Sequence, residues 1–337
     1  MICITTIEEQ VAKVIEYSQN VKNPQPQKML EKWYEAKKSF IDAWGDCIYE
    51  LPEPITFYLS AEEKRRRFNE FIDAVDNTYN NSDLTEFLDW LSIEEIFDNH
   101  MQRDWYLDGE NKIPKGTKIS KAFKYFESNE SVLRKLQDQL SLIIQEDKIE
   151  GVLCVSVHPL DYLSTSENTY NWRSCHALDG EYRSGNLSYM VDKSTVVCYL
   201  KSDKEETLPN FPFEWNSKKW RVLIYFSNDW NMIMAGRQYP FMTAAGLDCI
   251  TKTLLPAAGI SHNSSWTKWH TELLDEMVFN DDSGMAFTFN DTYVPVGGKL
   301  VPMSELVQDR KGSLQFNDLL RSSCYSPMYA YRVLKEN

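Results

Sequence analysis

Hydrophobic side chains in the first part of the chain recur every three or four positions, which is the spacing of one face of an α-helix. The clearest run spans residues 30–48, and a Pro-Glu-Pro sequence ends it because proline cannot continue a helix. Ser60, with Glu63 three residues later, is typical of the start of another helix. The spacing therefore predicts a helical region over residues 1–149.

The pattern changes near Glu150, where runs of β-branched and apolar residues replace the helical spacing. Strands are predicted at residues 151–157, 194–200, 221–226 and 231–235, with a hairpin turn at 227–230 and a helix at 243–255. Ten of the thirteen glycines follow Glu150, so turns are frequent there. The whole pattern predicts an α+β fold, in which the helical N-terminal region packs with a mostly antiparallel sheet plus helices. Residues 150–337 form the second region, and the arrangement of 256–337 is not predicted.

The chain carries a net charge of −14, unevenly distributed. Residues 1–150 contain 29 acidic and 19 basic side chains, and the remainder contains 21 and 17. A negative surface repels phosphate backbones, so the average charge argues against binding of bulk duplex DNA, although a local basic patch would overrule that average. The charges are interspersed, and ordinary solubility is a simpler explanation than docking on a basic partner or imitation of DNA.

Cysteine usage and hydropathy bear on the compartment. The seven cysteines are scattered, odd in number and never spaced C-x-x-C, which is typical of reduced cytosolic thiols. No apolar run approaches the roughly 20 residues that span a bilayer, and no secretory leader pattern opens the chain. We therefore expect a cytoplasmic protein that has no membrane partner.

Residues 158–185 connect two predicted strands and are long for such a connection, which favours a functional segment. Cys175 is a candidate nucleophile, with His158 as its base and Asp179, or alternatively Asp161, orienting that base. Further candidates would bind the substrate, the arginines by holding an anion. They are Trp172, Arg173, His176, Tyr182 and Arg183. The simpler alternative makes Cys175 a small buried apolar residue and His176 a hydrogen-bonded polar one.

A zinc site is disfavoured, although Cys154, His158, Cys175 and His176 are suitable ligand types. On a continuous strand, Cys154 and His158 would lie roughly 13 Å apart, too far to share one ion. Cys175 and His176 are neighbours, an awkward pair for chelation. No glycine-rich phosphate-binding motif is present either, so the sequence implies neither a metal nor a cofactor.

Three short patterns lie in this part of the chain: W-x-S-C at residues 172–175, G-x-Y-R-x-G at 180–185 and W-N-S-K-K-W-R at 215–221. Together they resemble uncharacterised proteins of bacteriophages and prophages of Firmicutes. The resemblance covers roughly residues 156–240. It implies a phage or mobile-element origin and a place in the bacterial cytoplasm, but no catalytic residues, because that group has no established activity.

Two functions stay open at this point. The first is an accessory protein that binds and blocks a host or defence protein, and it is favoured because no complete catalytic set is present. The second is a transferase or hydrolase centred on Cys175. Trp215 and Trp220, with the basic residues between and after them, either stack on bases or pack in the core, and the core is favoured.

Overall fold

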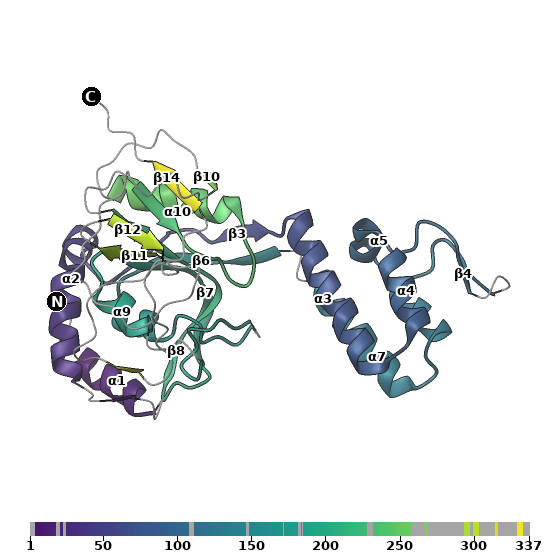
Figure 1. Ribbon diagram of the computed structural model, residues 1–337, viewed down its shortest axis with the longest axis horizontal. Helices are drawn as coiled ribbons and strands as arrows, with labels where there is room; N and C mark the ends of the chain where they lie inside the picture. The colour runs from purple at the N-terminus through teal and green to yellow at the C-terminus, as the bar shows by residue number, and fades with distance from the viewer. Residues whose placement is uncertain are drawn as a thin grey trace. The chain divides into compact units, whose positions relative to one another are not determined.

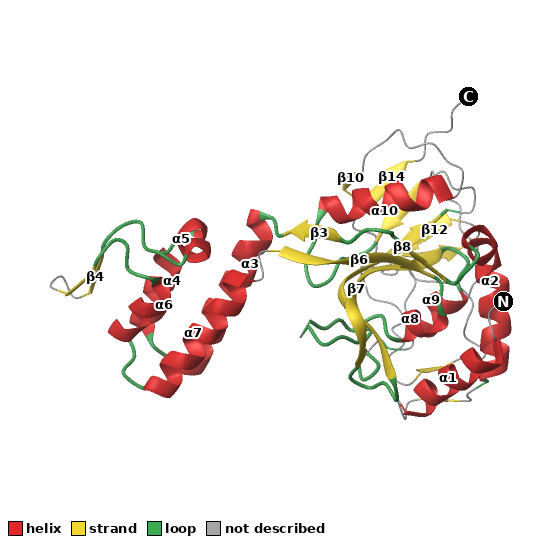
Figure 2. Cartoon of the chain, turned by 180° about the vertical axis from the view of Figure 1, so that it is seen from behind, coloured by secondary structure: helices red, strands yellow, loops and turns green. Residues whose placement is uncertain are grey.

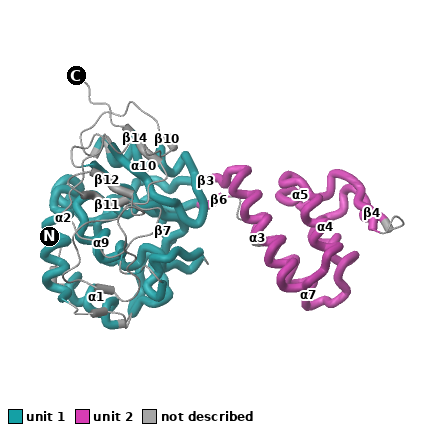
Figure 3. Tube along the Cα trace, viewed as in Figure 1, with its two compact units in different colours: residues 1–56, 150–337 teal, residues 57–149 magenta. Residues whose placement is uncertain are grey.

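The computed structural model describes residues 4–17, 21–22, 25–107, 111–145, 148–170, 172–180, 183, 185–227, 232–257, 267–268, 293–296, 299–302, 314–315 and 329–332. The chain forms two compact units, shown in Figures 1 and 3. Unit 1 comprises residues 1–56 and 150–337, and unit 2 comprises residues 57–149. Unit 2 is thus an insertion in the sequence of unit 1. In the described part of the chain, no helix combines the length and the apolar character needed to cross a bilayer.

Unit 1 is built on one large sheet. Neighbouring strands of this sheet run antiparallel wherever the structure describes how their residues pair. Its strands, in spatial order, are β10 (Thr267–Lys268), β14 (Tyr329–Arg332), β9 (Met232–Ala235), β8 (Glu214–Phe226), β7 (Thr195–Thr207), β6 (Lys148–Ser156) and β2 (Ile48–Glu50), and β3 (Ile55–Tyr58) also pairs with β6. Two small pairs lie outside it: β1 (Val21–Lys22) with β13 (Leu314–Gln315), and β11 (Tyr293–Val296) with β12 (Lys299–Pro302). The long central strands β6, β7 and β8 carry the candidate site.

Helices cover the two faces of this sheet. They are α1 (Ile4–Tyr17), α2 (Pro26–Trp44), α8 (Pro159–Leu163), α9 (Gly185–Val191) and α10 (Ala244–Ala257). Trp220 and Arg221 are neighbours in β8, so their side chains point to opposite faces. Gly246 of α10 packs on the Trp220 ring, whereas Arg221 bonds to the segment after α8. Consequently α10 and the α8 segment lie on opposite faces, and Figure 2 shows α8 and α9 inside the curve of the sheet.

A buried lysine joins α2 to α9 and β7. The Nζ of Lys37 donates to the carbonyls of Tyr189 (3.2 Å), Thr195 (2.6 Å) and Asp192. The last carbonyls of a helix have no partner within it, and Lys37 supplies donors at this end of α9. Burial lowers the pKa of Lys37 to about 7, against the opposing effect of Asp192.

Unit 2 has a hydrophobic core of its own, which includes Phe68, Phe87, Phe123 and Leu140. Its elements are α3 (Ala61–Tyr79), α4 (Ser82–Trp90), α5 (Ile93–Asp98), β4 (Trp105–Leu107), β5 (Asn111–Ile113), α6 (Ile119–Ala122), η1 (Phe123–Tyr125) and α7 (Glu130–Gln145). The predicted helix start is confirmed, since the Oγ of Ser60 accepts a hydrogen bond from the Glu63 backbone at 3.1 Å.

The α+β fold class is confirmed, and the four strands predicted after Glu150 match β6, β7, β8 and β9. The extent of the helical region is different. Residues 1–56 belong to the unit that contains the sheet, and β2 and β3 pair with β6. The spacing predicts a helix through Ile48, but α2 ends at Trp44, Gly45 caps it with a left-handed φ of 76°, and β2 begins at Ile48. A strand of three residues is too short to show the alternation of apolar and polar residues from which a strand is predicted.

Candidate functional site

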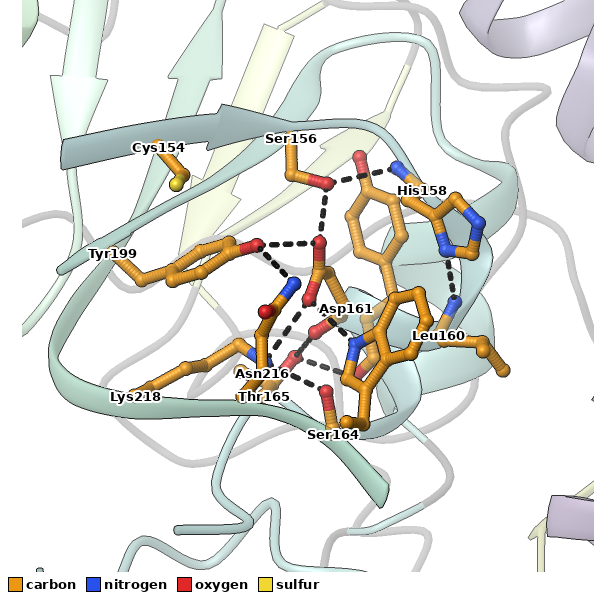
Figure 4. A network of polar contacts seen from close by, with 12 residues as sticks. Cys154, Ser156, His158, Leu160, Asp161, Ser164, Thr165, Tyr199, Asn216 and Lys218 are labelled. Carbon is orange, nitrogen blue, oxygen red and sulfur yellow. Dashed lines mark hydrogen bonds and ion pairs between the residues drawn. The ribbon is translucent and has the colours of Figure 1, made fainter. Parts of the chain in front are cut away.

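The segment that follows β6 is held by a buried carboxylate, shown in Figure 4. Asp161, on α8, is completely buried. It accepts hydrogen bonds from Ser156 Oγ (2.6 Å), Tyr199 OH (3.0 Å), Trp215 Nε1 (3.0 Å) and Lys218 Nζ (3.1 Å). A carboxylate has about four acceptor sites, so these donors saturate it.

Lys218 on β8 is the counter-charge of Asp161 and is also completely buried. Its ammonium donates to Ser164 Oγ at 2.6 Å and lies 4.7 Å from the centre of the Tyr199 ring. Burial raises the pKa of Asp161, but the charge of Lys218, the interaction with His158 and the hydrogen bonds from Ser156 and Trp215 together hold that pKa below its ordinary value. Burial also lowers the pKa of Lys218 against the attraction of Asp161. The carboxylate of Asp161 is therefore ionised at neutral pH, and both members of the pair are hydrogen-bonded within the protein.

His158 belongs to the same network, but its imidazole is not available as a base. Its Nδ1 accepts a hydrogen bond from the backbone of Leu160 at 3.3 Å, and its ring lies 4.9 Å from the ring of Trp215. This hydrogen bond assigns the proton to Nε2, so the lone pair on Nδ1 is already used to cap α8. Burial lowers the pKa of His158, against the charge of Asp161. The imidazole therefore acts as a neutral cap.

A second buried cation fastens the rest of the segment to β8. Arg221 donates from Nε to the carbonyl of Thr165 at 3.0 Å, and from Nη2 to Ser166 Oγ (3.3 Å) and Ser174 Oγ (3.0 Å). The indole of Trp172 donates to the carbonyl of Lys218 at 2.9 Å. Trp172, Ser174, Lys218 and Arg221 belong to two of the patterns described above, W-x-S-C and W-N-S-K-K-W-R. In this chain, those two patterns contact each other and hold the loop on the sheet.

The tryptophans at 215 and 220 pack within the protein. Trp220 is completely buried and its Nε1 donates to the carbonyl of Phe241 at 3.1 Å. Trp215 is partly buried and, as described above, donates to Asp161. Both indole N–H groups are therefore committed to internal hydrogen bonds.

Cys175 is partly buried and lies beside the next residue in the chain, with Sγ 4.0 Å from His176 Nδ1. Burial, followed by the charge of Arg221, lowers the pKa of His176 to about 3. An imidazole whose pKa is this low does not hold a proton taken from a thiol at neutral pH. Cys175 and His176 therefore do not form a thiolate–imidazolium pair at neutral pH.

The remaining predicted residues lie in separate contacts. Arg173 and Asp179 form an exposed ion pair of 2.7 Å. Arg183 donates from Nη1 to the carbonyl of Gly180 at 2.7 Å. The rings of Trp172 and Tyr239 stack 5.8 Å apart. Tyr182 lies outside the described residues. His158, Cys175 and Asp179 thus bond to different partners, because His158 caps α8 and Asp179 pairs with an arginine.

Sequence reasoning missed Glu167, whose carboxylate is almost completely buried. Its two oxygens accept hydrogen bonds from the Leu178 backbone (2.7 Å) and from Asn210 Nδ2 (3.4 Å). Glu167 thereby links the turn after Cys175 to the β7–β8 connection. Burial raises the pKa of Glu167 to about 7. No signal in the sequence marks this residue, because a glutamate in a polar loop is ordinarily exposed.

Glu167→Gln should stabilise the protein increasingly as the pH rises. The folded-state pKa of Glu167, about 7, lies above the unfolded value of 4.5, so the folded form holds the proton more tightly and loses stability as the pH rises between these values. Glutamine removes this loss. We expect its advantage in the free energy of unfolding to grow by about 2 kcal/mol between pH 5.5 and 8. Urea unfolding at both pH values measures it.

The control for this experiment is Glu205→Gln, at an exposed position on β7. Its effect should be the same at both pH values. An advantage of Glu167→Gln that does not change with pH would show that the Glu167 carboxylate ionises normally in the folded protein.

Similarity to known proteins does not indicate a function for this chain. No known protein family, curated protein or solved structure matches the chain. Among the residues that the structure describes, no group of three or more His, Cys, Asp or Glu side chains is placed to hold a metal ion. The function is therefore argued from the contacts above and from the sequence.

Proposed function

We propose that this chain is a phage or mobile-element accessory protein of the bacterial cytoplasm, which binds and blocks a host or defence protein. The observation that carries the proposal is that the buried charges of the candidate segment bond to the protein itself. Asp161 and Lys218 pair with each other, and Arg221 bonds to three groups of the loop. General acid–base catalysis requires a titratable group within reach of the substrate. Because these charges hold the segment in its own fold, they are not free to act on a substrate. The segment therefore fits binding better than catalysis.

Surface charge and the resemblance support the same proposal. The net charge of −14 favours a partner with basic surface over bulk duplex DNA. The patterns shared with phage proteins supply the contacts that hold residues 165–174 on β8. A loop that the sheet holds in one shape offers a fixed surface for recognition of a partner.

The alternative is a transferase or hydrolase centred on Cys175. The observation that favours it is the partial exposure of this thiol next to an imidazole nitrogen. The low pKa of His176 weighs against it, since a base with a pKa of about 3 does not activate a thiol near pH 7. The two proposals make different predictions for one substitution.

Cys175→Ser should leave partner binding and the effect on the host unchanged, because serine is nearly isosteric and no thiol chemistry is involved. The full-length tagged chain, wild type and variant, is used to capture proteins from a bacterial host. The captured protein is then purified and mixed with each form, and size-exclusion chromatography with light scattering measures the complex. We expect the same complex with both forms.

The outcome that would contradict the proposal is equally definite. If Cys175→Ser retains the wild-type melting temperature but loses the effect on the host, the cysteine-centred enzyme is favoured. If no captured protein forms a complex with the purified chain, protein binding is contradicted.

A further inference from the structure

Unit 2 carries a row of lysines that contrasts with the acidic chain around it. Lys112, Lys115, Lys118, Lys121 and Lys124 follow one another at intervals of three, and residues 111–126 contain no acidic side chain. All five are exposed. We call them the lysine row. Five positive charges within 13 residues make a local basic patch, although unit 2 as a whole has 19 acidic and 13 basic residues.

The fold holds the lysine row against the core of unit 2. Ile113, Ile119, Ala122 and Phe123 alternate with the lysines and are completely buried. The backbone between them is fixed as well, since Met101 N donates to Thr117 O at 3.0 Å, and the side chain of Gln137 donates to Ser120 O at 2.7 Å. The lysines are therefore presented on an ordered surface.

Lys118 is the N-cap residue of α6, Lys121 lies on α6, and Lys124 lies on η1. Side chains three residues apart lie next to one another on a helix surface. Lys112 pairs with Asp104 at 2.8 Å. Lys115, Lys118, Lys121 and Lys124 make no ion pair with any residue that the structure describes. The charges of Lys118, Lys121 and Lys124 are thus available to an anionic ligand, whereas that of Lys115 also acts on the carboxylate of Asp104.

Exposed aromatic rings stand at both ends of the row. Tyr125 follows Lys124 directly and is 50% exposed. Tyr106 on β4 is 58% exposed, and Lys112 Nζ lies 5.9 Å from the centre of its ring. Large aromatic side chains this exposed gain little from the fold of unit 2, whereas their faces suit stacking by a flat ligand.

We propose that the lysine row, with Tyr106 and Tyr125, is a binding surface for single-stranded nucleic acid. Ammonium groups neutralise successive phosphates, and tyrosine rings stack on bases that a single strand leaves unpaired. Duplex DNA keeps its bases stacked inside, so it uses the lysines but not the tyrosines. An acidic protein would also pair with the lysines, and binding of polyglutamate tests that alternative. The surface is separate from the residues discussed under the proposed function and does not depend on that proposal.

The test uses fluorescence anisotropy to measure how a fluorescein-labelled oligothymidylate binds to the full-length protein at several salt concentrations. The oligothymidylate has about 20 nucleotides, which is longer than one typical binding site. The charge-reversal variant is Lys118→Glu/Lys121→Glu/Lys124→Glu. It should weaken binding by at least roughly tenfold and reduce the dependence of log K on log salt by about 2, at roughly 0.7 for each lost phosphate contact. Tyr106→Ala/Tyr125→Ala should weaken binding by roughly tenfold with an unchanged salt dependence.

The matched control is Lys28→Glu/Lys193→Glu/Lys252→Glu, which makes the same change of net charge at exposed lysines of unit 1. Its affinity should stay close to that of the wild type. Circular dichroism of each variant verifies that the fold is retained. The corresponding duplex and inorganic polyphosphate are used as competitors, and we expect both to compete more weakly than the unlabelled single strand.

Several results would overturn this proposal. They are an absence of binding by the wild type, equal losses in the charge-reversal and control variants, and competition by duplex or polyphosphate as strong as that of the single strand. Binding of polyglutamate through the same lysines, without binding of the oligothymidylate, would instead assign the surface to an acidic protein. An unchanged affinity in the tyrosine variant would remove base stacking and with it the preference for single strands.

Discussion

Asp161→Asn should lower the free energy of unfolding by about 3–5 kcal/mol, because it leaves the buried ammonium of Lys218 without a counter-charge. Both side chains are completely buried, so water does not compensate the loss. Asparagine also presents donors where Ser156 and Tyr199 already donate, which adds to the cost. Equilibrium urea unfolding of the full-length chain at pH 7 measures the change.

The double variant Asp161→Asn/Lys218→Met separates the loss of the charge partner from the loss of packing. Removing both charges eliminates the uncompensated ammonium, so a large part of the lost stability should return. Asp42→Asn, which breaks the exposed ion pair with Lys38, serves as the control and should change stability very little. If Asp161→Asn costs less than about 1 kcal/mol, Lys218 is not held as a buried cation.

Three of the four predicted strands, β6, β7 and β8, have enough residues to establish a pattern. The central strands β6, β7 and β8 contain long apolar, β-branched runs, so their place after Glu150 was predictable. Strand β2 has three residues and follows a helix with a regular hydrophobic spacing, so the spacing extended the helix through it. Its pairing with β6 is a long-range contact, which local spacing does not encode.

The candidate site shows the same limit. The segment 158–185 was identified from its length and polar content, but its important partners come from distant strands. Lys218 lies 57 residues from Asp161, and Arg221 lies 47 from Ser174. Which side chains meet depends on the register of β6, β7 and β8, and a shift of one residue would turn every side chain to the other face. Sequence analysis therefore proposed His158 as a base because it is near in the chain, whereas the fold uses it as a helix cap.

Arg221→Lys should lower the free energy of unfolding by about 2–4 kcal/mol, although it preserves the charge. The guanidinium bonds to Thr165 through Nε and to Ser166 and Ser174 through Nη2. The lysine ammonium is a compact charge and does not reproduce the planar, forked set of donors of a guanidinium. Buried oxygens of the loop therefore lose their donor. Urea unfolding of the variant measures the loss.

The effect should concentrate on the turn that carries Cys175, because Ser174 is the residue before it. When the Arg221 bonds are lost, the turn opens more often, and the thiol of Cys175 should react with a maleimide roughly tenfold faster or more. Digestion and mass spectrometry assign the label to this cysteine among the seven. Arg237→Lys is the control, since Arg237 is exposed and lies 5.4 Å from the centre of the Tyr239 ring, which Arg221 approaches to 4.6 Å. It should change neither stability nor labelling. A loss of stability in Arg221→Lys with an unchanged labelling rate at Cys175 would show that Arg221 stabilises the sheet and does not hold the turn.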